Sequence, residues 1–154
     1  MRRHDERGAV AGLEALLFSV LILVAGSVLL VNAWAVLDTR AALDAAAREF
    51  TRSFTEQTDT TTARHVATAA ALNSLAHRGL DPDLVEITIG LPQGFGPCAV
   101  VQVTLQRRIA WLRAPFVGDL DDTLVQVVHR ELIDAHREVM ASVDFDPRAT
   151  ECAR

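Results

Sequence analysis

The chain has 154 residues, half of them hydrophobic, and a formal net charge of −5 at pH 7. This length accommodates one small domain. The negative charge argues against nucleic acid as a partner, because phosphate binding requires a basic surface.

The N-terminal quarter contains a long apolar run, Ala15 to Leu37, with 23 residues and no charge. At ~1.5 Å rise per residue it spans roughly 34 Å as a helix, which is enough to cross a hydrocarbon core of ~30 Å. A core helix of a soluble protein is rarely this long and apolar on every side. The run therefore predicts a transmembrane helix over residues 10–37.

A cleaved signal peptide is the competing interpretation of the same run. Arg2, Arg3 and Arg7 form a basic leader, and Ala33 and Ala35 offer an A-x-A cleavage site. Against it, the run is longer than the ~7–15 apolar residues of a usual signal peptide. The helical pattern also continues past the proposed cut.

The orientation in the membrane rests on a small difference in basic residues. The leader adds the N-terminal amine to its three arginines, whereas the segment after the run carries Arg40, Arg48 and Arg52. The basic-residue rule thus slightly favours an N-terminus inside and a C-terminal domain outside the cytoplasmic membrane.

Glu14 stands at the start of the apolar run. A carboxylate at the bilayer centre costs ~2.5–3.5 kcal/mol, and less near the edge. One interpretation is that Glu14 marks the boundary, in a first helical turn where its charge suits the helix dipole. The other is that it awaits a cation from a neighbouring chain, because a carboxylate in low dielectric takes up a proton or finds a cation.

The stretch "RGAVAGLEALLFSVLILVAG", followed by "ALDAAAREF", resembles the TadE-like family of pseudopilins and minor pilins of tight-adherence (Tad/Flp) pilus assembly systems. Its basic leader, small residues, Glu and long apolar helix are similar to the class III, prepilin-like signal. The later "VEITIGLPQGFGPCAVVQVTLQRRI" resembles the strand pair of that family, so the resemblance extends from the N-terminus to Ile109.

The resemblance implies a processing site and a role for Glu14. A prepilin peptidase, an aspartyl protease of the membrane, would remove leader residues 1–9 on the cytoplasmic side. In pilin-like assemblies the fifth mature residue is a Glu that pairs with the N-terminal amine of a neighbouring subunit. Cleavage after Gly8 makes Glu14 the sixth mature residue, whereas cleavage between Ala9 and Val10 makes it the fifth, so the second position is slightly favoured.

The helix is expected to continue beyond the membrane as an amphipathic helix. An apolar seam with spacings of 7, 4, 3 and 4 supports this continuation, and only Arg40 interrupts it. The seam consists of Val36, Leu43, Ala47, Phe50 and Phe54.

A turn at residues 55–62, with Asp59 suited to an N-cap, separates this helix from a second one. The second helix is expected from Thr61 to Arg78, with Gly79 ending it. Its expected apolar face consists of Val66, Ala69, Leu72 or Asn73, and Ala76.

Two segments, 85–91 and 99–105, alternate between apolar and polar residues and flank a turn at 92–97. This pattern predicts an antiparallel hairpin with one buried face. The next segment is ambiguous: Leu124, Val128 and Leu132 fit a helix, whereas the β-branched residues fit a strand. The family resemblance implies a strand over 123–133.

The sequence shows no set of residues typical of a catalytic or metal-binding site. The five histidines lack the i, i+4 spacing of metal ligands, and no phosphate-binding loop or nucleophile–base set is present. We therefore expect no enzyme activity, no cofactor and no metal. Cys98 and Cys152 lack metal-ligand spacing too; they either form a disulfide in an oxidising compartment or remain free thiols.

The predicted fold class is α+β and pilin-like: a leader (1–9), a transmembrane helix (10–37), an extracytoplasmic helix with a small α+β head (38–143) and a flexible tail (144–154). The resemblance implies a structural or assembly subunit of a Tad/Flp-type adhesion pilus. Its expected partners are the prepilin peptidase, other pilin-like subunits, the membrane assembly platform and lipid. The alternative is a secreted or membrane-anchored binding module with an ordinary signal sequence and no pilus role.

Overall fold

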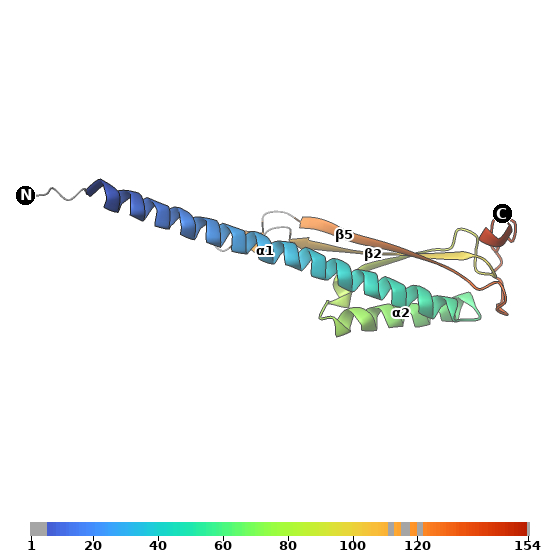
Figure 1. The fold of residues 1–154 in the computed structure, drawn as a ribbon. Coiled ribbons are helices and arrows are strands. Elements are labelled where there is room, and N and C mark those ends of the chain that lie inside the picture. The colour runs from blue at the N-terminus through green and yellow to red at the C-terminus, as the bar shows by residue number, and fades with distance from the viewer. Residues whose placement is uncertain (1–5, 111–112, 115–117, 120–121, 154) are drawn as a thin grey trace, which may run out of the picture.

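The computed structural model describes residues 6–110, 113–114, 118–119 and 122–153 (Figure 1). A long N-terminal helix, a second helix and a three-stranded antiparallel sheet confirm the predicted α+β class. The elements are α1 (Glu6–Thr55), α2 (Thr60–His77), the 3-10 helix η1 (Pro82–Leu84), β1 (Glu86–Gly90), β2 (Val100–Ala110), β3 (Arg113–Ala114), β4 (Gly118–Asp119), β5 (Asp122–Leu132) and the 3-10 helix η2 (Glu151–Ala153).

Helix α1 is a single rod of 50 residues, about 75 Å long at 1.5 Å per residue. Its N-terminal half stands away from the rest of the molecule (Figure 1). We call residues 14–37 the arm, because their side chains are exposed or at most half-buried and full burial begins only at Thr39. The arm is long and apolar enough to cross a membrane, and none of its most apolar window is buried inside the molecule.

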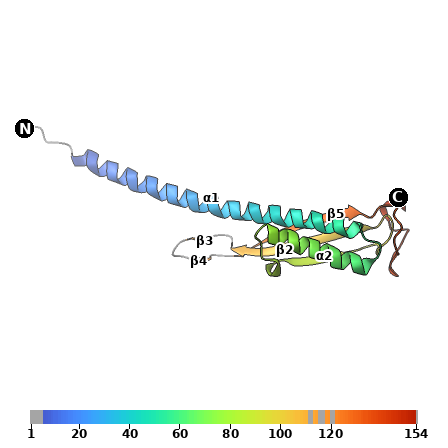
Figure 2. The same cartoon turned by 90° about the horizontal axis from the view of Figure 1, so that it is seen from below.

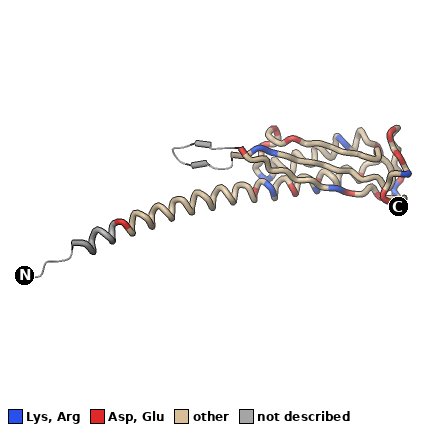
Figure 3. The backbone as a smooth tube through the Cα atoms, turned by 90° about the horizontal axis from the view of Figure 1, so that it is seen from above, with Lys and Arg blue, Asp and Glu red and all other residues tan. Residues whose placement is uncertain are grey.

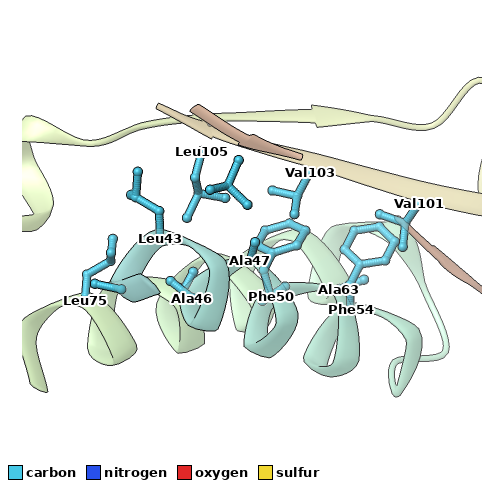
Figure 4. Packing of buried hydrophobic residues seen from close by; sticks show 14 of the residues in the cluster. Leu43, Ala46, Ala47, Phe50, Phe54, Ala63, Leu75, Val101, Val103 and Leu105 are labelled. Carbon is cyan, nitrogen blue, oxygen red and sulfur yellow. The ribbon is translucent and has the colours of Figure 1, made fainter. Parts of the chain in front are cut away.

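The C-terminal half of α1 forms the core of the head. The expected seam is confirmed here, because Leu43, Ala47, Phe50 and Phe54 are fully buried. Figure 4 shows these side chains between the two helices and the sheet. Arg40, the residue that interrupts the seam, points away from the core and is exposed. Its charge is therefore not buried.

Helix α2 begins at Thr60, one residue before the expected start and directly after the expected N-cap, Asp59. The Asp59 carboxylate accepts hydrogen bonds from the backbone N–H groups of Thr61 and Thr62, at 3.1 and 2.9 Å. At the other end Gly79 adopts a φ of +73°, a left-handed conformation that favours glycine.

The expected apolar face of α2 is wrong. Val66, Ala69, Asn73 and Ala76 are exposed and Leu72 is only half-buried. The residues that pack into the core are Ala63, Ala67, Ala71 and Leu75. Small side chains at a spacing of four allow α2 to lie close to the alanines of α1, so the helix turns its larger Val66 outward.

The sheet has the strand order β1-β2-β5, and both pairs are antiparallel. The segment that the sequence left ambiguous, 123–133, forms a strand. It corresponds to β5, which pairs with β2 from Asp122–Ala110 to Leu132–Val100. Val125 and Val127 therefore face the core, while Leu124, Val128 and Leu132, which would form one helical face, point outward. Long-range pairing decides the conformation of a segment whose local pattern fits both alternatives.

The C-terminal segment is not a free tail in the structure, contrary to the expectation for 144–154. The N–H of Asp146 donates to the carbonyl of Gln93 at 3.0 Å, and the N–H of Glu151 donates to that of Cys98 at 3.3 Å. A disulfide joins Cys98 to Cys152, with a Cα–Cα distance of 5.6 Å. These bonds hold residues 144–153 against the loop between β1 and β2.

Candidate functional site

The expected processing residues and Glu14 lie on one continuous helix. Gly8, Ala9 and Val10 fall in the first turns of α1, which begins at Glu6. Glu14 follows Val10 by four residues, or about 6 Å along the axis. The structure thus places Glu14 about one turn from Val10, the residue at which the mature chain is expected to begin.

Glu14 is exposed and has no hydrogen-bond or ion-pair partner within the described part of the chain. The other polar side chains of the arm differ in this respect. Ser19, Ser27 and Asn32 each donate to a backbone carbonyl four residues earlier, at 2.7–2.8 Å. Such bonds satisfy polar groups inside a bilayer, so the Glu14 carboxylate, unlike these three side chains, needs a partner from elsewhere.

The opposite end of the arm carries Trp34, whose side chain is exposed. Glu14 and Trp34 are separated by 20 residues, or about 30 Å of helix, which equals the thickness of a hydrocarbon core. Figure 3 shows that the arm is uncharged from the acidic position near its start to the beginning of the head. Tryptophan is typical of membrane–water interfaces. The 20-residue separation from Glu14 is the signal by which the sequence could have identified Trp34 as an interfacial residue.

The disulfide lies far from Glu14, because Cys152 belongs to η2 beside the C-terminus, which lies at the end of the molecule opposite the N-terminus (Figure 1). Cys98 has a φ of +62° and is nearly buried. Disulfides persist in oxidising compartments. The pair therefore belongs to the structure of the head and takes no part in the site at the arm.

The rest of the described surface carries shallow grooves. One groove of about 670 Å³ lies between α1 and α2 beside Glu49, His77 and Arg78. Across the described ranges, no group of three His, Cys, Asp or Glu side chains could hold a metal ion. The candidate site is therefore the arm with Glu14.

No protein-family model, curated protein or solved structure matches the chain.

Proposed function

We propose that the chain is a structural or assembly subunit of a Tad/Flp-type pilus, a pilin-like protein inserted by α1 and trimmed by a prepilin peptidase. The observation that carries the proposal is the Glu14 carboxylate, which lacks a partner within the described chain, at the base of an exposed apolar arm. Ser19, Ser27 and Asn32 of that arm each donate a hydrogen bond within the helix.

The mechanism follows from the cost of an unpaired carboxylate in low dielectric. Insertion places Glu14 at the edge of the hydrocarbon, where its cost is moderate. Trimming creates a new amine on the same side of the membrane. When two arms pack laterally, the amine of one subunit pairs with Glu14 of the next, which compensates both charges and sets the axial register between the helices.

The head would lie outside the cytoplasmic membrane, with the leader inside. The disulfide supports this orientation, because such bonds persist in extracytoplasmic compartments and are rare in the cytosol. The partners of the subunit are the peptidase, other pilin-like subunits, the assembly platform and membrane lipid.

The test is the mature N-terminus of the full chain after co-expression with a prepilin peptidase. A chain that begins at Ala9 or Val10 supports the proposal, provided that an inactive peptidase leaves Met1 in place. A chain that begins at Val36 contradicts it and indicates the secreted binding module. An intact Met1 with active peptidase also contradicts it and leaves only a membrane anchor.

A further inference from the structure

Strands β2 and β5 continue beyond the third strand of the sheet. The β1–β2 register ends at the pair Glu86–Gln106, whereas β2 and β5 remain paired as far as Ala110–Asp122. The result is a two-stranded ribbon that leaves the head. Figure 2 shows it pointing along the arm toward the N-terminus, with β3 and β4 beyond it.

The groove between α1 and β5 shows which residues of α1 lie beside the ribbon, that is, the height of the ribbon along the helix axis. This groove, centred near Ala41 on the helix, is also lined by Val127. Leu124 lies three strand residues from Val127, or about 10 Å, which corresponds to about seven helical residues. Leu124 and its partner Arg108 are therefore level with about residue 34 of α1, at the end of the apolar run.

The burial of the arm agrees with this height. Val28, Asn32 and Val36 are half-buried, whereas the other residues of the arm are exposed. Their spacing of four places them on one face of the helix, and β3 contacts α1. The ribbon thus overlaps the last third of the segment that is long enough to span a membrane.

The side chains at the start of the ribbon suit a membrane interface. Arg107, Arg108, Leu84 and Leu124 line one surface groove of about 340 Å³. Leu84 is 58% exposed and Leu124 is 49% exposed. The Nε of Arg107 is buried without a hydrogen-bond partner within the described chain, and Arg108 is exposed.

Glu86 also lines this groove, and no ion pair between its carboxylate and these arginines occurs in the described part of the chain. Glu86 accepts a hydrogen bond from the Nε2 of Gln106 at 2.6 Å. Because a guanidinium binds a phosphate through two parallel hydrogen bonds, an arginine at this height can reach a phospholipid headgroup. Figure 3 shows basic positions, with acidic positions beside them, at the end of the sheet nearest to the arm.

We propose that this end of the sheet is a second membrane contact. Arg107 and Arg108 bind the phosphates of phospholipid headgroups, and Leu84 and Leu124 enter the interface at the height of Trp34. The contact rests on the insertion of α1 that the proposed function assumes. It fixes the rotation of the head about the arm, and so the face that each subunit presents to its neighbours.

The test measures the depth of two positions on the same face of β5. The full chain, with a fluorophore on Leu124→Cys or Leu132→Cys, is reconstituted in phosphatidylcholine–phosphatidylglycerol vesicles that contain a lipid with a nitroxide headgroup. The native cysteines are paired and escape labelling. Leu132 is a matched control, since it is 44% exposed and lies eight residues, about 26 Å, farther from the arm.

We expect several-fold stronger quenching at residue 124 than at residue 132. Equal quenching at the two positions, or none at 124, overturns the inference. The double variant Arg107→Gln with Arg108→Gln should reduce the quenching at 124, and unchanged quenching would overturn the role of the arginines.

A third label, on Leu23→Cys in the middle of the arm, separates the two proposals. Quenching of this label by an acyl-chain nitroxide reports insertion of α1. If residue 23 is quenched and residue 124 is not, the second contact fails and the proposed function stands. If residue 23 is not quenched either, the anchor fails, and both proposals fail with it.

Discussion

Phe54 connects α1 to the loop between β1 and β2, and its replacement by alanine should destabilise the head severely. The Phe54 ring is fully buried. It stacks on Phe50 with ring centroids 5.8 Å apart and meets Phe95 edge-on at 5.7 Å. Truncation of a buried Phe costs about 3–5 kcal/mol, of which each aromatic pair contributes about 0.5–1.5 kcal/mol.

The loss is a large fraction of the stability of a typical domain, about 5–15 kcal/mol. The assay is urea unfolding of the full chain in detergent micelles, followed by far-UV circular dichroism. We expect a lower midpoint with the helical signal of the arm retained, because the arm has no contact with Phe54. Val143→Ala, at a fully exposed position, is the control and should change the free energy of unfolding by less than about 0.5 kcal/mol. A loss below about 1 kcal/mol for Phe54→Ala would refute the bridging role of the ring.

Three further predictions concern the head, each measured by unfolding of the full chain. Cys98→Ser should cost at most about 4 kcal/mol, from the 54-residue separation that the disulfide closes; a reductant that leaves the wild type unchanged would contradict this. Gly94→Ala should cost about 1–3 kcal/mol, because φ is +74° and a Cβ would lie 2.6 Å from the backbone of Phe145; an unchanged midpoint would contradict the close approach. The backbone N–H of Thr62, which donates to Asp59, holds the pKa of Asp59 below its usual value. A depressed pKa stabilises the fold above the unfolded-state pKa of ~3.9, and this contribution is lost as the pH falls through the folded-state value. The wild type should therefore be more stable than Asp59→Ala at pH 7 and lose that advantage below about pH 4, and an advantage independent of pH would contradict the cap.

The helices could be predicted from the sequence because their signals are local. The uncharged run and the seam around Phe50 give the length and the buried face of α1, and Asp59 and Gly79 mark the ends of α2. The buried face of α2 could not be predicted, since it depends on how closely two helices approach. Alanines that recur every four residues are as compatible with solvent as with a neighbouring helix.

Features that depend on contacts between distant parts of the chain were harder to predict, because they have no local signal in the sequence. The pattern around Val128 fits a helix and a strand equally, and only the register with β2 decides between them. The disulfide and the position of the C-terminal segment depend on which loop Cys98 occupies in space. The height of the ribbon along the arm follows from β2 and β5 together and has no signal in either strand alone.

Assembly of the Glu14→Leu variant tests the central claim most directly. The full chain is produced with the prepilin peptidase and its pilin-like partners, and insertion, trimming and the cross-linked polymer fraction are measured. Ser19→Ala is the control in the same arm, because its hydroxyl bonds within the helix. We predict normal insertion and at least about a tenfold loss of polymer for Glu14→Leu, as expected when one partner of a desolvated ion pair is removed. Trimming and polymer formation equal to those of the wild type would contradict the account and leave α1 as a simple membrane anchor.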